Sequence, residues 1–520
     1  MIDLLTYPPT LAALVIGLIA AVPTAARWLR VAQRDHYVPG GVTRMAWLWV
    51  TREPATAVLL VIALAFTAVA VPSGVPPLGP YWAIVAIVAL AFTPLGLPVR
   101  GRSAKFAFTV RMKRLTVAWI TLHVAAVIIL VALFAEAAAI APALVLLASA
   151  PLTDLALAIM APIEKALSKK YVVQAQKRLQ QVKPRIVAIT GSYGKTSTKN
   201  YVAHLVSATY PTVASPASFN NRLGLSRAVN DKLVPGTEIF VAEIGMAGEG
   251  QIRELCQAFP PDIAAITVIG EAHLERMRTT DAIFREKAQI TENAKTVVIP
   301  IDDPRLAAHA DACVAQGKTV VTVSTAGADA DVVLDAVAGT IRIGRATQPV
   351  PVSVSGTGHA VNVAVAAGIA LASGVPVDTI AGRLGELPGS AHRAEVQTAP
   401  SGARIIDDTY NSNPVGAHRA LEGAAALAAE SGGPLVVVTP GMVELGPVQA
   451  ERNRAFGEAI KQAGGVLYAV GRTNRAALVR GFGAGAETVA RREQAVAAAV
   501  AKAGDRGVIL YENDLPDHYP

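Results

Sequence analysis

The stretch Val187–Asn200, VAITGSYGKTSTKN, combines residue types that bind the phosphates of a nucleotide. An apolar run ends at a glycine-bounded turn, and Lys195 and Thr196 then begin a predicted helix. Backbone N–H groups at a helix N-terminus bind anions, and a lysine at this place meets the outer phosphates. The common pattern G-x-x-x-x-G-K-[ST] would require glycine where the chain has Ile189. We therefore predict an ATP-binding loop of another class, made of Gly191, Ser192, Tyr193, Gly194, Lys195, Thr196 and Ser197.

A divalent metal is the second expectation at this loop. Negative oxygens crowd together when a phosphoryl group is transferred, and this charge requires a metal ion and fixed cations. Thr196 can ligate Mg²⁺ through its hydroxyl, and Glu243, at the end of the apolar run IFVAE, offers a hard carboxylate oxygen. The alternative for Glu243 is an ordinary solvated acid at the end of a strand.

The elements that must position these residues follow from the pattern after Arg185. Strand-like runs alternate there with helical patterns: RIVAIT, EIFVAEIG, IAAITVIG, TVVIPI and KTVVTVS. This alternation predicts an α/β fold with a largely parallel sheet. A second series begins near Pro388, with ARIIDD, PLVVVTP, GVLYAVG and GVILYE, and predicts a separate Rossmann-like domain. The expected domains are residues 1–165, 166–386 and 387–520.

The first of these domains is predicted to be a helical membrane region. About five apolar stretches are long enough to span a bilayer: Thr10–Ala26, Ala55–Val71, Tyr81–Pro98, Thr116–Leu133 and Ala138–Met160. The first is not a signal peptide, because its arginines follow the apolar core instead of preceding it.

Loop charges predict the orientation of these spans. The segments Arg27–Arg52 and Arg100–Arg114 are rich in basic residues, whereas Pro72–Pro80 and Phe134–Ala137 carry none. The positive-inside rule then places the basic loops in the cytosol and the N-terminus outside. Five crossings would leave everything after Met160 in the cytosol, so we expect a multi-pass protein of the cytoplasmic (inner) membrane with its catalytic domains in the cytosol.

Composition excludes some classes of protein. Residues 1–170 contain 14 of the 47 basic and 6 of the 39 acidic residues, and therefore carry the whole net charge of +8. The neutral remainder argues against a nucleic-acid partner. The two cysteines can form neither a disulfide framework nor a four-cysteine zinc site.

Seven motifs resemble those of the Mur ligases, the ATP-dependent amide-forming enzymes of peptidoglycan assembly. In order along the chain they are TGSYGKTSTK, FNNRLGLSRAV, AEIGMAGEGQI, AHLERMRTTDAIFREKAQI, HRAEV, IIDDTYNSNP and PGMVELG. The resemblance covers about two thirds of the chain. It implies a central P-loop domain, a C-terminal domain, ATP with two Mg²⁺ sites, and an acyl-phosphate intermediate.

The resemblance also implies roles for residues near the phosphates. His273 matches a ligand of the second metal, and Lys287 matches a lysine that is carbamylated and thereby supports the metal. Lys287 could otherwise be an ordinary surface lysine. Asn220 and Asn221 match an asparagine pair near the reacting phosphate, with Asn221 as the expected catalytic member; alternatively the pair caps a turn. The expected catalytic set is Lys195, His273, Lys287 and Asn221.

For the nucleotide, the resemblance implies contacts from both domains. Asn362 matches an adenine contact, and Arg393 and Asp408 match residues that close over ATP. His359 lies three residues before Asn362 where the family has four, so a structural role is expected for it. Near Asp408 lie further polar residues of the motif DTYNSNP, which are Tyr410, Asn411 and Asn413.

The sequence indicates the type of reaction more narrowly than it indicates the substrates. The expected acid is a cell-wall precursor, either UDP-linked or lipid-linked, and the expected amine is an amino acid or a dipeptide such as D-Ala-D-Ala. Ala247, Gly248 and the final stretch ENDLPDHYP depart from the family pattern. The alternatives are a ligase for another polymer such as poly-γ-glutamate, or a non-catalytic membrane scaffold. The loop Arg34–Arg44 is either a juxtamembrane turn or a contact for a phosphorylated lipid headgroup.

Overall fold

The computed structural model describes residues 7–70, 78–100, 106–134, 138–217, 219–246, 248–345, 347–352, 360–388, 395–409 and 412–520. The chain divides into two units. The helical unit contains residues 1–167, 471–473 and 515–520, and the α/β unit contains residues 168–470 and 474–514.

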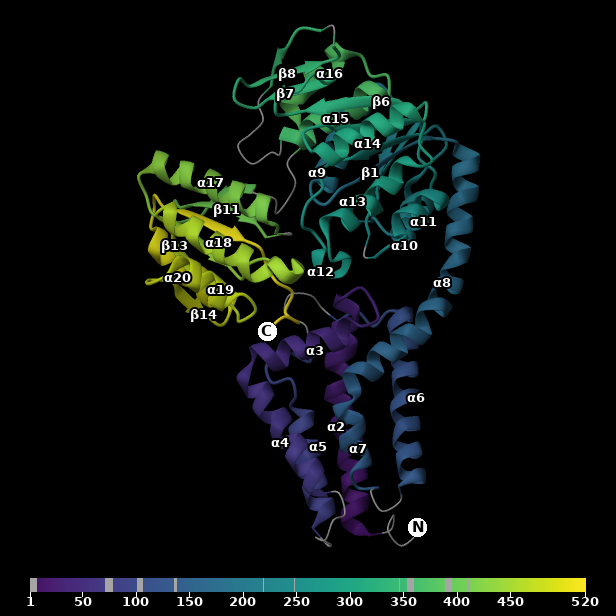
Figure 1. Cartoon of the computed structure of the whole chain (residues 1–520), viewed down its shortest axis with the longest axis vertical. Helices are drawn as coiled ribbons and strands as arrows, with labels where there is room; N and C mark the ends of the chain where they lie inside the picture. The colour runs from purple at the N-terminus through teal and green to yellow at the C-terminus, as the bar shows by residue number, and fades with distance from the viewer. Residues whose placement is uncertain are drawn as a thin grey trace. The chain divides into compact units, whose positions relative to one another are not determined.

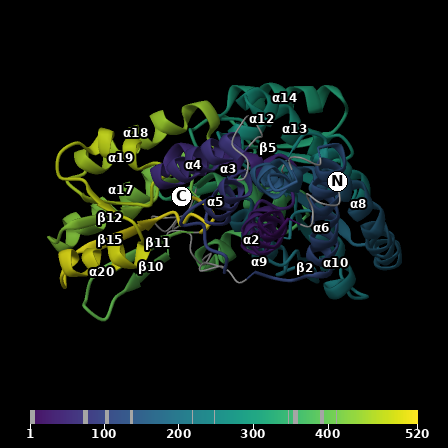
Figure 2. The same ribbon diagram turned by 90° about the horizontal axis from the view of Figure 1, so that it is seen from below.

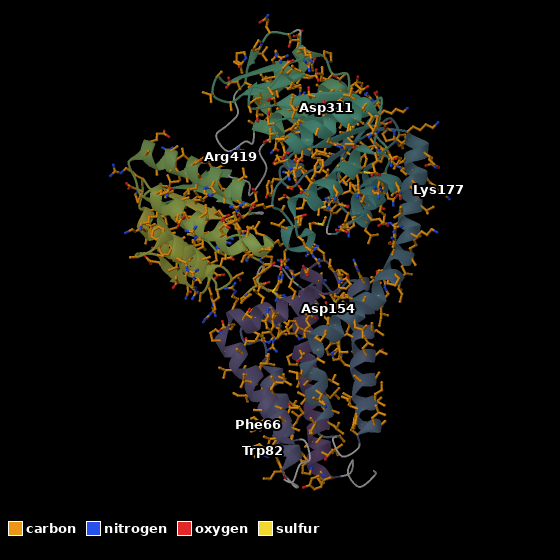
Figure 3. The ribbon with its side chains drawn as sticks, viewed as in Figure 1. Phe66, Trp82, Asp154, Lys177, Asp311 and Arg419 are labelled. Carbon is orange, nitrogen blue, oxygen red and sulfur yellow. The ribbon has the colours of Figure 1, made fainter. Side chains whose placement is uncertain are left out.

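The helical unit is built from apolar helices that run alongside one another (Figure 1). Its helices are α2 (Pro8–Arg34), α3 (Gly41–Arg52), α4 (Pro54–Ala70), α5 (Gly79–Ala91), α6 (Val110–Leu133), α7 (Ala141–Leu147) and α8 (Ser149–Val182), the last of which continues into the α/β unit. One end carries the stacked rings of Phe66 and Trp82 (Figure 3). Nearer the other end, Asp154 accepts hydrogen bonds from the backbone N–H groups of Val42 and Thr43, at the beginning of α3.

The prediction of about five spans was too high. Only α2 and α6 are long and apolar enough to cross a membrane among the described residues, and the number rises to four if each bent pair is one span. The pairs are α3 with α4, bent by 104°, and α7 with α8, bent by 67°. The stretch expected to span at Tyr81–Pro98 forms α5, whose 13 residues rise only about 20 Å. Apolar length in the sequence therefore overestimated helix length, because the helix ends before Pro94.

The first half of the α/β unit is a nine-stranded sheet in the order β2-β3-β1-β4-β5-β6-β7-β8-β9. In this order, neighbouring strands from β2 as far as β7, β1 included, pair in parallel. The pairs β7–β8 and β8–β9 are antiparallel. The strands are β1 (Arg185–Thr190), β2 (Thr212–Ala214), β3 (Ile239–Glu243), β4 (Ile263–Ile266), β5 (Thr296–Pro300), β6 (Thr319–Ser324), β7 (Val332–Asp335), β8 (Thr340–Ile343) and β9 (Val350–Pro351).

Helices cover both faces of this sheet, which explains why its central strands are continuous apolar runs. In β1, Val187 and Ile189 pack towards α9 (Lys195–Val206) and α15 (Ala360–Ala372). Ile186 and Ala188 pack on the opposite face, in a core shared with α8, α10 (Arg222–Lys232), α11 (Gln251–Ala258), α13 (Thr280–Ala288) and α14 (Pro304–Ala315). Shorter elements are α12 (Leu274–Met277), η2 (Gln289–Thr291), α16 (Val377–Arg383) and η3 (Leu384–Glu386).

The second half is a six-stranded sheet in the order β10-β11-β15-β12-β13-β14, parallel except for β10. The helices α17 to α19 cover one face and α20 the other, as Figure 2 shows from below. Its elements are β10 (Glu395–Thr398), β11 (Arg404–Asp408), α17 (Pro414–Ser431), β12 (Leu435–Thr439), η4 (Gly446–Val448), α18 (Gln449–Gln462), β13 (Val466–Val470), α19 (Arg475–Phe482), β14 (Glu487–Val489), α20 (Arg492–Ala503) and β15 (Val508–Glu512). The predicted α/β class is confirmed for both sheets.

Candidate active site

The predicted phosphate-binding loop joins the end of β1 to the beginning of α9. Gly194 precedes the first helical residue and has a φ of +79°, which favours glycine. A Cβ there would lie 2.0 Å from Oδ1 of Asn362, so only glycine leaves room for this buried side chain. No partner for Oδ1 of Asn362 occurs in the described part of the chain, which leaves an acceptor open beside the loop. The structure thus brings Asn362, which is expected to contact adenine, against the loop.

The rest of the loop is fixed against the end of β4. The backbone N–H of Ser192 donates to the carbonyl of Val268 (2.7 Å), and its Oγ exchanges hydrogen bonds with the backbone of Gly270. The hydroxyl of Thr267 donates to the carbonyl of Tyr193. Nζ of Lys195 lies over the loop and donates to the carbonyl of Gly191 (2.8 Å). Ser197 is buried in the first turn of α9. The loop is therefore held in place before any ligand binds.

Oxygen atoms suited to Mg²⁺ meet at the beginning of α9. Because β3 pairs with β1, Glu243 lies opposite Ile189, next to the loop. Its Oε2 accepts from the hydroxyl of Thr196 (2.9 Å), and its Oε1 accepts from Nδ2 of Asn220 (3.0 Å). Nζ of Lys199 lies 3.4 Å from Oε2. A threonine hydroxyl and a carboxylate are hard ligands, so this pair fits magnesium.

Lys287 is buried in α13, with 1% of its surface exposed. Its pKa lies well below the ordinary value, mainly because of burial and then because of the nearby charge of Lys195. Glu286 acts in the opposite direction, but its carboxylate already accepts from the N–H groups of Gly250 and Ile252. The alternative of an ordinary surface lysine is therefore wrong. Lys287 lies close enough to Lys195 to influence the same site.

His273 lies at the start of α12, in a left-handed conformation with φ of +60°. Its Nδ1 is 2.8 Å from Oε2 of Glu444, which comes from the motif PGMVELG of the second sheet domain. A neighbouring ion pair joins Glu271 to Arg452 at 2.7 Å. Within the described ranges, no three His, Cys, Asp or Glu side chains are grouped as a ready-made metal cage. The structure thus places His273 beside a carboxylate and does not group it with Glu243.

Some of the remaining predicted residues lie within the described ranges, and the others lie outside them. Asn221 caps α10, where its Oδ1 accepts from the N–H of Gly224 (2.9 Å), and Asn413 caps α17 in the same way. Asp408 ends β11, opposite Glu512. The positions of His359, Arg393, Tyr410 and Asn411, and that of Ala247, lie outside the described residues.

The sequence did not point to Glu512, the buried last residue of β15. Burial raises its pKa to about 7, although the hydroxyls of Ser412 and Thr439 donate to it. Lys199 and Glu444 were also missed as individual residues, although both lie inside quoted motifs. For Glu512 the only signal was its place at the end of an apolar run, which many strand-end acids share.

Comparison with known proteins decides the family. The Mur ligase middle domain matches residues 189–370, and the Mur ligase glutamate ligase domain matches residues 392–511. The chain belongs to the Mur ligase family. Among its relatives, the UDP-N-acetylmuramoyl-tripeptide–D-alanyl-D-alanine ligase of Mycobacterium leprae is 32% identical over 47% of this chain and 50% of its own length. The enzyme of the same name from Bacillus subtilis is 29% identical over 55% of this chain and 62% of its own length.

Solved structures of the family share the fold. MurF from Acinetobacter baumannii matches with a TM-score of 0.57 at 23% identity, covering 66% of this chain and 76% of that one. MurF from Thermotoga maritima in complex with ADP matches with a TM-score of 0.56 at 23% identity, over 66% of this chain and 80% of its own. The chain spans about half the length of the first mycobacterial relatives.

Proposed function

We propose that the protein is an ATP-dependent ligase that joins the carboxylate of a cell-wall precursor to an amine, with release of ADP and phosphate. The observation that carries the proposal is the pair formed by Thr196 and Glu243 at the beginning of α9, with Lys195 and the buried Lys287 close by. The names of the curated relatives favour UDP-N-acetylmuramoyl-tripeptide as the acid and D-Ala-D-Ala as the amine.

The arrangement suits two successive displacements. A carboxylate oxygen of the acid attacks the γ-phosphorus of ATP, and ADP leaves; the amine then attacks the acyl carbon, and phosphate leaves. The N–H groups at the beginning of α9 hold the phosphates, and Lys195 turns from the loop carbonyls to the transferring phosphoryl group. Magnesium held by Thr196 and Glu243 would neutralise the charge that accumulates on these oxygens.

His273 is suited to a second metal site. A carboxylate partner such as Glu444 holds the proton on Nδ1 of the imidazole, which leaves Nε2 unprotonated as a ligand. The same pair joins the two sheet domains of the α/β unit. We therefore assign His273 and Glu444 a joint role in which the C-terminal domain orients a metal ligand of the central domain.

Lys287 is suited to carbamylation. Only the neutral amine attacks CO₂, forming an N–C bond and releasing a proton, and burial together with Lys195 lowers the pKa of Lys287, which favours its neutral amine. The product is an anion, which the nearby cation of Lys195 attracts. Such a carboxylate would support the metal ion.

The helical unit is proposed to lie in the cytoplasmic membrane, with the α/β unit in the cytosol where ATP is available. Small side chains fill the interior between helices, among them Ala13, Ala63 and Ala83, whereas large apolar ones face outward. Leu18 and Leu133 are 70% and 69% exposed, respectively. Outward leucines and inward alanines are typical of helices packed in lipid. Membrane lipids are thus its expected surroundings.

The test is a ligation assay with the full chain in lipid nanodiscs. ATP, UDP-N-acetylmuramoyl-tripeptide and D-Ala-D-Ala are supplied, and ADP, phosphate and the mass of the coupled product are measured. A parallel reaction with the lipid-linked form of the acid distinguishes the two forms of precursor. ADP formation that requires both acid and amine supports the proposal; no product with either acid, in protein that binds ATP, contradicts the assigned substrates.

Two variants control this assay. Lys195→Ala should lose at least a hundredfold in turnover, because the cation that meets the phosphoryl charge is gone. Lys177→Ala removes an exposed lysine of α8 (Figure 3) and should leave turnover unchanged. Equal turnover in the two variants would refute the role of the loop.

A further inference from the structure

The segment Leu515–Pro520, which follows β15, belongs to the helical unit. Asp517 forms an ion pair with Arg30 of α2, and both side chains are buried, with 7% and 1% exposed. Arg30 also donates to the carbonyl of Pro98 (2.9 Å), which fixes the guanidinium in place. An ion pair removed from water to this extent requires close and specific geometry.

The next two residues use different contacts. The carbonyl of His518 accepts from Nε1 of Trp49 in α3 (2.9 Å), and both residues are almost completely buried. The ring of Tyr519 packs against the apolar cluster that contains Trp28, Met45 and Trp49. Acidic, backbone and aromatic groups of the segment therefore each meet a matching group of the helical unit.

The segment is bound at its far end as well. The carbonyl of Pro520 accepts from the N–H groups of Arg472 and Thr473 and from the hydroxyl of Thr473 (2.8 Å). Arg472 in turn pairs with Glu53, between α3 and α4, at 2.8 Å. Residues 471–473 are part of the helical unit, although they lie between β13 and α19 in the sequence.

Basic groups surround His518 from several sides. Arg30 and Arg34 come from α2, His36 from the following turn and Arg44 from α3, and Asp35 pairs with Arg44. Burial and these charges lower the pKa of His518 to about 3, so its ring is neutral when buried. The acidic member of the segment, Asp517, thus complements a basic surface.

We propose that Leu515–Pro520 is a docking segment whose receptor is the polar end of α2 and α3, with Arg30 and Trp49 as its main contacts. The chain first enters the α/β unit through α8, touches the helical unit again at residues 471–473, and returns to it after the last strand through the docked segment. The ligase domains are then attached at both ends of their sequence. The occupant of this receptor is the chain's own segment. It lies in the final stretch ENDLPDHYP, where the sequence departs from the family pattern.

Thiol labelling of the full chain in membranes tests this proposal. His518→Cys keeps the backbone carbonyl that Trp49 binds, and the two native cysteines are buried. Asp505→Cys, at an exposed position of the α/β unit shortly before the segment, is the control. A polar maleimide should label position 518 at least tenfold more slowly than position 505. Adding Asp517→Asn to His518→Cys should raise the rate at least tenfold, because Arg30 then loses its buried partner.

A second, more conservative variant tests the docking contact in case the first variant does not fold. Trp49→Phe keeps an aromatic ring but removes the donor, and should raise labelling of position 518 about three- to tenfold. Labelling of position 518 as fast as that of 505 would overturn the proposal. So would slow labelling that neither Asp517→Asn nor Trp49→Phe accelerates. Because labelling needs no substrate, its outcome is independent of the ligation assay.

Discussion

Replacement of Gly194 by alanine isolates what the phosphate-binding loop contributes. A residue with a side chain in the left-handed region costs about 1–2 kcal/mol, and Gly194 has a φ of +79°. The new Cβ would also lie 2.0 Å from Oδ1 of Asn362. Moving that side chain off its rotamer adds about 0.5–1.5 kcal/mol. We expect Gly194→Ala to lower the stability of the ligand-free domain by about 1.5–3.5 kcal/mol.

Gly317→Ala is the matched control. Gly317 has nearly the same φ, +77°, lies exposed after α14, and has nothing within 4 Å of the position of a Cβ. Gly317→Ala should therefore lower the stability only by the cost of a side chain in the left-handed backbone conformation, about 1–2 kcal/mol. Both variants are compared by the thermal transition of the α/β unit within the full chain, and by ATP affinity measured calorimetrically. The difference in thermal stability between the two variants measures the cost of the clash with Asn362.

Affinity for ATP gives the decisive result. Gly194→Ala should bind ATP at least tenfold more weakly than Gly317→Ala, a difference of about 1.4 kcal/mol. The double variant Gly194→Ala with Asn362→Ala should melt higher than Gly194→Ala alone, because the clash is removed. If Gly194→Ala and Gly317→Ala bind ATP within twofold of each other, the assignment of this loop to the nucleotide is refuted.

Three further predictions concern other parts of the chain. Lys287→Ala should be nearly inactive and partly restored by millimolar acetate or formate, because a short carboxylate can replace a carbamate; activity equal to wild type would contradict the metal-supporting role. Docking of the segment Leu515–Pro520 should weaken at acidic pH. The pKa of His518 is about 3 when buried, against an ordinary 6.5, so its stabilising effect is complete above pH 6.5 and is lost as the pH falls towards 3. With Tyr519→Cys as reporter, labelling relative to an exposed cysteine should rise about tenfold between pH 7.5 and 5.5, and this rise should vanish in His518→Gln. Reporter fusions after Arg102 and after Pro520 should both be cytoplasmic, and a periplasmic signal from the second would contradict the ligase function because ATP is absent there.

The strands of the α/β unit were predictable because burial on both faces leaves a continuous apolar run. RIVAIT coincides with β1, and the runs around Ile239, Ile263 and Thr296 coincide with β3, β4 and β5. Local chemistry also specified the loop, since glycine, lysine and threonine act there through positions adjacent in the chain. The spans were overcounted because apolar composition does not reveal where a helix bends or ends, as at the bend between α7 and α8 inside the predicted span Ala138–Met160.

Contacts between distant positions could not be predicted from spacing. Glu243 was proposed from its place at a strand end, but its hydrogen bond to Thr196 depends on β3 pairing with β1 in one register. The surface alternative for Lys287 failed because helical periodicity alone does not show what packs on a helix. The partner of His273, Glu444, lies 171 positions away, in another domain.

The sequence by itself determined the order of elements, the phosphate loop and the family, because each depends on residues close together in the chain. The tertiary structure decided the environment of each residue. Burial of Lys287 beside Lys195, and of Asp517 against Arg30, arises only when elements far apart in sequence exclude water from the same place. Low water content strengthens charge interactions and shifts pKa values, and no local pattern encodes it.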